Sequence, residues 1–138
     1  MGNLVKYVTS LHQSTNREYI KRMVDGKVNC MLKAKEYEFD YWDGSRRYGY
    51  GGYKYMPGRW KQVAELLIKN YNLTNTSSVL DVGCGKGFLL YEMKLLLPNL
   101  KISGFDISKH GIEHAKEEIK KYLFIHHAQK TYPFKNKE

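Results

Sequence analysis

The sequence contains few of the residues that define several large classes of proteins. Its two cysteines, Cys30 and Cys84, are too few for a disulfide framework. No apolar run approaches the ~18 residues that a membrane-spanning helix needs, and the opening residues MGNLVKYVTS have no apolar core of the kind found in signal peptides. The sequence therefore predicts a soluble, cytoplasmic protein without a membrane span.

Arginine is also scarce, although the chain is strongly basic. The formal net charge is +9, from 23 lysines and arginines against 14 acidic residues, and the basic residues are spread along the whole chain. Recognition of phosphates and bases favours the bidentate fork of arginine. The arginines are Arg17, Arg22, Arg46, Arg47 and Arg59. This balance favours a solvated, lysine-rich surface and leaves a nucleic-acid partner open.

Length and composition indicate a globular chain. The 138 residues are enough for one domain or for part of a larger one. A content of 42% hydrophobic and 27% charged residues is typical of a folded protein rather than a disordered one. The composition shifts along the chain, and no internal repeat or low-complexity tract is present.

The N-terminal part, residues 1–59, is predicted to be a helical and loop extension. Thr15 and Glu18 form a capping box at the start of a helix, which Gly26 ends. A second short helix is expected over residues 29–37. The extension then leads into a domain of different character.

The C-terminal part, residues 60–138, alternates between helix and strand patterns. It begins with an amphipathic helix, because apolar residues recur at the spacing of one helix face: Trp60, Val63, Ala64, Leu67, Ile68 and Tyr71. Short apolar runs then predict strands over residues 79–82, 101–105 and 122–125, with helices over 88–97 and 108–120. Strands that alternate with helices of about ten residues form βαβ units with a parallel sheet.

A glycine-rich loop within the sequence VLDVGCGKGFLL joins the first strand to the next helix. Such a loop lets a ligand approach the backbone and points helix N–H groups at it. A P-loop is excluded, because Gly87 stands where Ser or Thr belongs and Leu80 stands where the first glycine belongs. A dinucleotide-binding turn is disfavoured, because Phe88 occupies the third glycine position.

The pattern that remains is an acidic residue followed by alternating glycines: Asp81, Gly83, Gly85 and Gly87. Residues 79–108 resemble motif I and the following acidic motif of the class I S-adenosylmethionine (SAM) dependent methyltransferases. The stretch DVGCGKG fits the family pattern D-x-G-x-G-x-G at every defined position, and GFDIS resembles the end of the family's second strand, with its acidic residue at Asp106. The separation between the two carboxylates suits the helix and turn of one βαβ crossover.

The resemblance implies a role for each residue of these motifs. The loop would run beneath the methionine and ribose parts of SAM, with contacts from Gly83, Cys84, Gly85 and Gly87. Asp81 would hold the methionine ammonium, directly or through water, and Asp106, with Ile107 beside it, would accept hydrogen bonds from the ribose hydroxyls. A carboxylate suits both an ammonium and a vicinal diol.

The resemblance also implies a fold, an α/β Rossmann-like parallel sheet. After the third strand the family places a contact to the adenine, for which His127, Gln129 or the backbone N–H of Ala128 could serve. Methyltransferases of this class carry a seven-stranded sheet, and three strands are predicted here. We therefore expect a chain truncated after the third strand, with residues 60–138 as a partial SAM-binding domain. The edge of the first strand would then be unpaired.

The implied activity is methyl transfer from SAM to an acceptor. A small-molecule or carbohydrate acceptor is favoured, and nucleic acid stays open. No residue can be assigned as the catalytic base, and no oligomeric state is predicted. The alternative function is a non-catalytic module that binds nucleotide-like ligands or a partner protein.

The tyrosine- and glycine-rich block, residues 40–60, is predicted to form a turn or a hairpin-like loop. It could fold over the cofactor as a lid, with aromatic faces near the sulfonium cation and Arg46, Arg47 or Arg59 on an anionic group. Equally, it could be a surface loop whose tyrosines pack on neighbouring helices. The sequence leaves both interpretations open.

Two further patterns carry less chemistry. The stretch from His110 to His114 matches the H-x-x-E-H pattern of zinc peptidases, but no second metal-binding segment follows, so we expect an exposed helix and no metal. Cys84 lies at a helix N-terminus, which would lower the pKa of its thiol. No histidine can be paired with it, so we expect a small residue tolerated in a tight loop.

Overall fold

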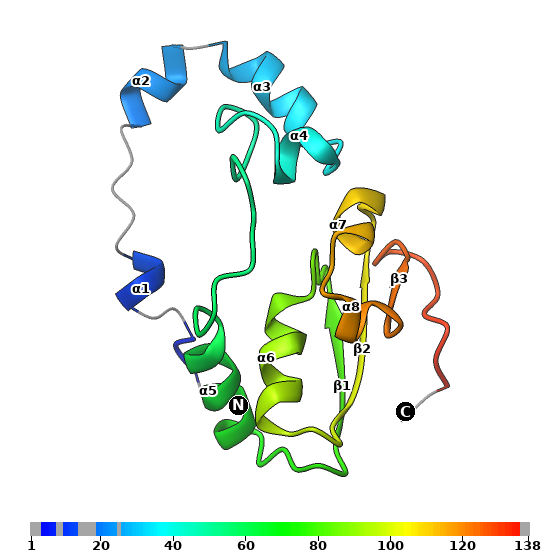
Figure 1. The fold of residues 1–138 in the computed structure, drawn as a ribbon. Coiled ribbons are helices and arrows are strands. Elements are labelled where there is room, and N and C mark those ends of the chain that lie inside the picture. The colour runs from blue at the N-terminus through cyan, green and yellow to red at the C-terminus, as the bar shows by residue number, and fades with distance from the viewer. Residues whose placement is uncertain (1–3, 8–9, 14–18, 25, 136–138) are drawn as a thin grey trace.

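The computed structural model describes residues 4–7, 10–13, 19–24 and 26–135. Strands in this part of the chain form one parallel sheet in the order β1-β2-β3 (Figure 1). The strands are β1 (Ser78–Val82), β2 (Lys101–Asp106) and β3 (Leu123–Ile125). The helices are α1 (Ser10–Gln13), α2 (Tyr19–Val24), α3 (Lys27–Ala34), α4 (Phe39–Trp42), α5 (Lys61–Asn70), α6 (Phe88–Leu96), α7 (Lys109–Glu113) and α8 (Glu117–Lys120).

The sheet confirms the predicted α/β, Rossmann-like arrangement. β1 pairs with β2 in parallel from Ser78 opposite Lys101 to Val82 opposite Phe105, and the β2–β3 pairing is also parallel. α6 makes the first crossover, and α7 with α8 makes the second. The carboxyl ends of the strands therefore meet at one edge of the sheet, where open α/β sheets bind their ligands.

The hydrophobic core lies between the sheet and the helices on one of its faces. In Figure 1, α5 and α6 run side by side along that face. Leu90 and Met93 of α6 and Ile119 of α8 are completely buried or nearly so. They pack in one cluster with Ala64, Leu100, Ile102, Ile112, Ala115 and Leu123. This packing holds α6 against the sheet.

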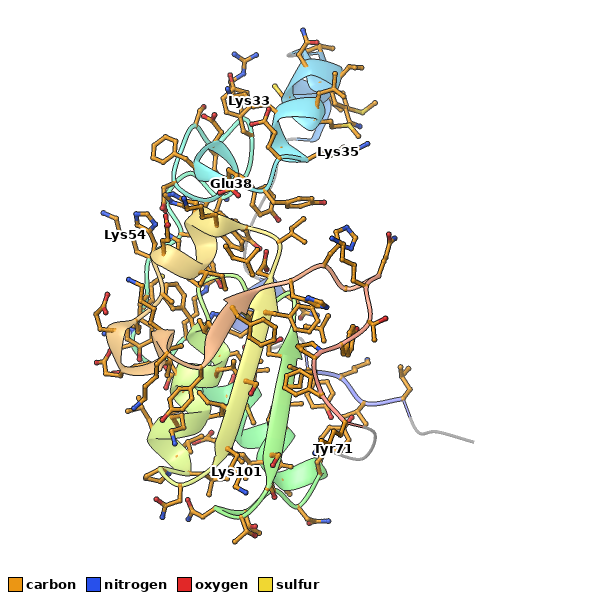
Figure 2. All side chains as sticks on the ribbon, turned by 90° about the vertical axis from the view of Figure 1, so that its right-hand side faces the viewer. Lys33, Lys35, Glu38, Lys54, Tyr71 and Lys101 are labelled. Carbon is orange, nitrogen blue, oxygen red and sulfur yellow. The ribbon has the colours of Figure 1, made fainter. Side chains whose placement is uncertain are left out.

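The opposite face of the sheet is partly open along β1. Figure 2 views the sheet from this side, with the strands in front of α6. The side chains of Leu80 and Val82 are 37% and 44% exposed. Among the residues that the structure describes, β1 pairs only with β2, so the predicted unpaired edge is present here. No helix in these same residues is long and apolar enough to cross a membrane.

Two helix predictions need correction. The single helix expected over residues 108–120 is two short helices, because Lys116 adopts an extended conformation between α7 and α8. Its ammonium lies 4.9 Å from the ring centroids of both Tyr55 and Tyr91, which favours this break. The helix expected over residues 29–37 begins earlier, at Lys27, and ends at Ala34. The capping box at residues 15–18 lies outside the described residues.

The block at residues 40–60 closes on itself without forming a strand. It opens with α4, a single helical turn that the sequence analysis missed. The N–H of Tyr50 donates to the carbonyl of Tyr41 at 2.8 Å, and the N–H of Tyr53 donates to the carbonyl of Trp42 at 2.9 Å. The chain therefore folds back on itself here, as the prediction of a hairpin-like loop required. The loop begins with a helical turn, which was not predicted.

Leu90 offers a direct test of the core. Because its side chain is fully buried, Leu90→Ala should lower the free energy of unfolding by roughly 2–5 kcal/mol. Leu95→Ala, in the same helix at a side chain that is 57% exposed, should change it by less than about 0.5 kcal/mol. Urea denaturation measures both, and equal losses would contradict the assigned face of α6.

Candidate functional site

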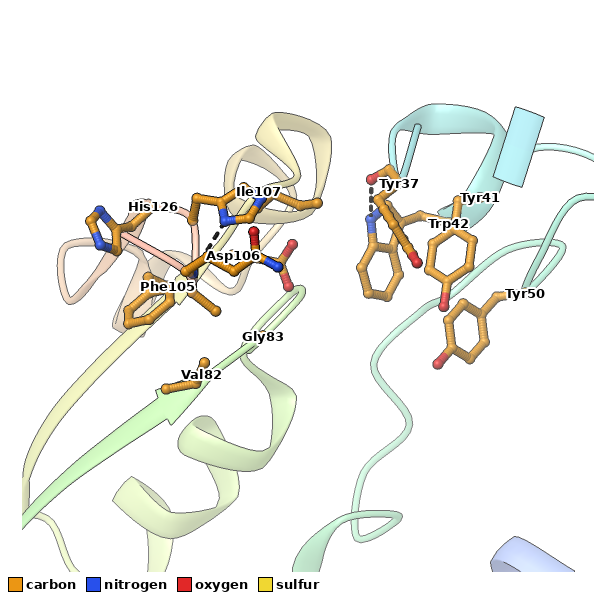
Figure 3. A pocket seen from close by; sticks show the side chains of 13 residues that line it. Tyr37, Tyr41, Trp42, Tyr50, Val82, Gly83, Phe105, Asp106, Ile107 and His126 are labelled. Atoms are coloured by element: carbon orange, nitrogen blue, oxygen red, sulfur yellow. Dashed lines mark hydrogen bonds between the residues drawn. The ribbon is translucent and has the colours of Figure 1, made fainter. Parts of the chain in front are cut away.

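A cavity of about 500 Å³ lies at the carboxyl ends of the strands. Its first wall comes from the sheet and the segment after β3, and consists of Val82, Gly83, Phe105, Asp106, Ile107, His126, His127, Ala128 and Gln129. Its second wall is aromatic and comes from the N-terminal part of the chain: Tyr37, Tyr41, Trp42 and Tyr50. Figure 3 shows the two walls facing each other. We call the second set the aromatic wall.

The glycine loop reaches this cavity at Gly83. Gly83, Gly85 and Gly87 all adopt positive φ angles, of 79°, 55° and 67°, a conformation that costs other residues roughly 1–2 kcal/mol. At Gly83 a Cβ atom would meet nothing within 4 Å, so the backbone here is open. At Gly85 a Cβ atom would lie 2.5 Å from Cη2 of Trp42. The loop thus presents backbone to the cavity at one glycine and accepts the indole ring at the next.

Asp106 joins this loop to the end of β2. One carboxylate oxygen accepts a hydrogen bond from the Gly85 N–H at 2.8 Å, and the other accepts from the Ser108 N–H at 2.9 Å. The residue is 9% exposed and lines the cavity. A carboxylate can accept about four hydrogen bonds, so these two leave capacity for a ligand. Asp106 therefore has a structural task that the sequence analysis did not foresee.

The other predicted site residues divide into two groups. Gly83, Ile107 and Ala128 line the cavity together with Asp106. The remainder lie in or beside the loop but not on the cavity wall: Asp81, Cys84, Gly85 and Gly87. Burial, and to a lesser degree the charge of Asp106, raise the pKa of Asp81. Burial also raises the pKa of the Cys84 thiol, so the lowering expected from the helix N-terminus is wrong.

Trp42 is the centre of the aromatic wall. Its buried indole donates from Nε1 to Ser108 Oγ at 2.8 Å and to the carbonyl of Tyr37 at 2.9 Å. The rings of Trp42 and Tyr50 lie parallel, with centroids 5.4 Å apart, and Tyr41 meets both edge-on. Burial, followed by the neighbouring Tyr50, raises the pKa of Tyr41 to about 12. Tyr41 is therefore uncharged at neutral pH.

Asp43 attaches the aromatic wall to the loop. Its carboxylate accepts from Lys86 Nζ at 2.7 and 2.8 Å, from the Tyr53 N–H at 3.0 Å, and contacts His110 Nε2 at 2.6 Å. Burial alone would raise the pKa of Asp43, but the hydrogen bonds from His110 and Lys86 hold it at about 2. The sequence analysis missed Asp43 and Lys86, and its prediction of an exposed helix at His110 is wrong for that side chain, which is 14% exposed.

Further contacts hold the same segment in place. The carboxylate of Glu38 accepts from the N–H groups of Lys109 and His110 at 2.9 and 2.8 Å, which caps α7. The buried carboxylate of Glu92 accepts from the Tyr55 hydroxyl at 3.0 Å and the Gly58 N–H at 2.9 Å. The 40–60 block thus contacts two different parts of the structure. Trp42 and its neighbours line the cavity, whereas later tyrosines of the block pack on α6.

Two further sequence patterns were considered above: the arginines of the 40–60 block and the H-x-x-E-H stretch. Arg46, Arg47 and Arg59 do not line the cavity. His110 and His114 stack with ring centroids 3.9 Å apart. In the described part of the chain, no group of three or more His, Cys, Asp or Glu side chains is arranged to hold a metal ion.

Comparisons with known proteins support the resemblance that the motif in the glycine loop indicated. A family model for a methyltransferase domain matches residues 73–130. Malonyl-[acyl-carrier protein] O-methyltransferase of Hahella chejuensis is 32% identical over 63 residues, which cover 46% of this chain and 23% of that protein. Ribosomal RNA small subunit methyltransferase C of Yersinia pseudotuberculosis is 32% identical over 107 residues, which cover 70% of this chain and 31% of that protein.

These matches support the class I SAM-dependent methyltransferase family, and the chain spans less than a third of the length of these curated relatives. A crystal structure of coclaurine N-methyltransferase, bound to N-methylheliamine and SAH, is similar with a TM-score of 0.41 and 17% identity. That similarity covers 84% of this chain and 39% of the other. The fold assignment itself rests on the strand order and crossovers described above.

The contact between Gly85 and Trp42 can be tested with two alanine variants. Both Gly85→Ala and Gly83→Ala force alanine into a positive φ, at roughly 1–2 kcal/mol each. Only Gly85→Ala also displaces Trp42. We therefore expect Gly85→Ala to lose more unfolding free energy than Gly83→Ala does. We expect tryptophan fluorescence to change in Gly85→Ala only. Identical behaviour of the two variants would show that the indole does not rest on the loop.

The lowered pKa of Asp43 predicts a pH dependence. Since the folded-state pKa is about 2 against an ordinary value of 3.8, Asp43 contributes stability above pH ~4, and this contribution is lost as the pH falls towards 2. The difference in urea midpoint between the wild type and Asp43→Asn should thus be constant above pH ~5 and shrink below pH ~4. A difference that is independent of pH would contradict the assignment.

Proposed function

We propose that this chain is the cofactor-binding part of a methyltransferase that moves a methyl group from SAM to an acceptor. The observation that carries the proposal is the D-x-G-x-G-x-G loop at the end of β1, tied through Gly85 to Asp106 at a cavity. The family matches support the same cofactor. In this proposal, residues 60–138 form a partial SAM-binding domain and residues 1–59 an extension that supplies the aromatic wall.

The residues present fit this cofactor. The cavity of about 500 Å³ falls within the 300–1,000 Å³ range of small-molecule and cofactor sites. The open backbone at Gly83 leaves room for close approach, and the carboxylate of Asp106 keeps hydrogen-bonding capacity towards the cavity. A vicinal diol and a sulfonium cation would thus meet a carboxylate and an aromatic surface.

The proposed roles follow from these positions. Asp106, with Ile107 beside it, accepts hydrogen bonds from the ribose hydroxyls, and the backbone N–H of Ala128 contacts the adenine. Asp81, which does not line the cavity, reaches the methionine ammonium through water. The glycine loop runs beneath the methionine and ribose, through Gly83, Cys84, Gly85 and Gly87.

The cofactor would supply the chemistry, because its methyl group is already activated on the sulfonium. The chain's own residues bind and orient it and exclude water with the aromatic wall. Tyr41 stays protonated at neutral pH, since its pKa is about 12, so it does not serve as a general base. We assign no catalytic base.

For the acceptor we propose a small molecule or a carbohydrate. The scattered lysines and the absence of Arg46, Arg47 and Arg59 from the cavity wall favour this class over nucleic acid. The names of the relatives describe methylation of malonyl-[acyl-carrier protein] and of ribosomal RNA, which are two further acceptor classes. The cytoplasmic location predicted from the sequence stays a prediction.

Calorimetric titration with SAM and with its demethylated product, S-adenosylhomocysteine, tests the cofactor site. Asp106→Ala should weaken binding by roughly 1–3 kcal/mol, because charge-assisted hydrogen bonds are lost. Glu113→Ala, at an exposed carboxylate of α7, is the matched control and should bind as the wild type does. Wild-type affinity in Asp106→Ala, with its folding checked by thermal unfolding, would remove Asp106 from the site.

A transfer assay tests the activity itself. The protein is incubated with methyl-labelled SAM and panels of sugars, small metabolites, acyl-carrier protein and RNA, and label incorporation is counted. Transfer to the sugar or metabolite panel is the expected result. Tight SAM binding without transfer to any panel would favour the alternative of a non-catalytic nucleotide-binding module.

A further inference from the structure

Lys86 occupies the variable position between the last two glycines of the loop, yet its side chain does not line the cavity. Only 4% of the residue is exposed. Its ammonium donates to both carboxylate oxygens of Asp43, at 2.7 and 2.8 Å, and to the carbonyl of Tyr53 at 2.8 Å. The three donors of the ammonium are therefore all used within the chain.

A buried ammonium needs its partner. Removing a charge from water is costly unless it is paired and hydrogen-bonded. The buried position of Lys86 thus requires Asp43, and Asp43 comes from the N-terminal extension, 43 residues earlier in the chain. The same ion pair consequently links the loop to the extension.

The ion pair is directly connected to the cavity. Asp43 follows Trp42, whose indole rests on Gly85 and donates to Ser108. The N–H groups of Gly85 and Ser108 in turn hold the two carboxylate oxygens of Asp106. A displacement of Asp43 would therefore move Trp42 and with it the aromatic wall. It would also disturb Gly85 and Ser108, which hold Asp106 on the other wall of the cavity.

We infer that Asp43 and Lys86 are positioning residues: their ion pair holds the aromatic wall against the glycine loop and thereby sets the affinity for the cofactor, which neither residue contacts. The inference rests on the proposed function, because it concerns the affinity of the same site. It differs from a purely stabilising role, in which the pair would support folding and leave the affinity unchanged.

The test measures S-adenosylhomocysteine affinity by calorimetry for Asp43→Asn, Lys86→Met and the double variant, well below their unfolding temperatures. Each single variant should lose about tenfold or more in affinity, within the usual range of coupling between sites. The double variant should lose no more than the weaker-binding single variant, because both remove the same interaction. Lys86→Arg, which retains the charge, should bind S-adenosylhomocysteine much more tightly than Lys86→Met does.

Leu90→Ala is the matched control for stability. It loses folding free energy without touching the cavity, so it should bind with wild-type affinity at the same temperature. If the single variants also bind with wild-type affinity, the ion pair only stabilises the fold and the inference is wrong, whereas the proposed cofactor site stands. If the wild type itself does not bind, the proposed function fails and this inference fails with it.

A second measurement uses the wild type alone and does not depend on whether a variant folds. Coupling is reciprocal, so a cofactor that binds better to the docked wall must also hold that wall in place. Adding S-adenosylhomocysteine should therefore slow hydrogen exchange at the amides of Tyr50, Gly52 and Tyr53, which donate to the carbonyls of Tyr41 and Trp42. Unchanged exchange at these amides in the saturated complex would overturn the inference.

Discussion

The carboxylate of Asp106 is the interaction on which the candidate site depends. It stands at the end of β2, and its two oxygens accept from the backbone of Gly85 on one side and Ser108 on the other. The parallel sheet brings these segments to one edge, but the sheet alone does not fix the loop between β1 and α6. Because a buried carboxylate must be satisfied by donors, these two hydrogen bonds hold the loop next to the end of β2, and Gly83 of that loop lines the cavity.

A second set of contacts gives the cavity its other wall. The aromatic side chains there come from an irregular segment, which three carboxylates join to the α/β part. Asp43 of the segment binds Lys86, and Glu38 binds the start of α7. Glu92 of α6 accepts from the N–H of Gly58. Polar anchors at three points keep an irregular segment in a defined position, as a small apolar interface alone would not.

The elements that the sequence predicted are those with local signals. Apolar runs and the glycine spacing placed β1, β2, β3 and the loop within one or two residues, and Asp106 was found from the same pattern. Trp42, Asp43 and Lys86 could not be found in this way, because each depends on a partner far along the chain. A charged residue at the variable position of a glycine loop has no local pattern that distinguishes a buried ion pair from a solvated side chain.

The capping of α7 has a consequence for how the chain folds. α7 has five residues, too few to be stable alone, and two of its first N–H donors are satisfied by Glu38, 71 and 72 residues earlier. Closing so long a loop carries an entropy cost that must be met before the cap can form. The start of α7 should therefore become ordered late, after the sheet is assembled, so that the last region to fold is the one beside the cavity.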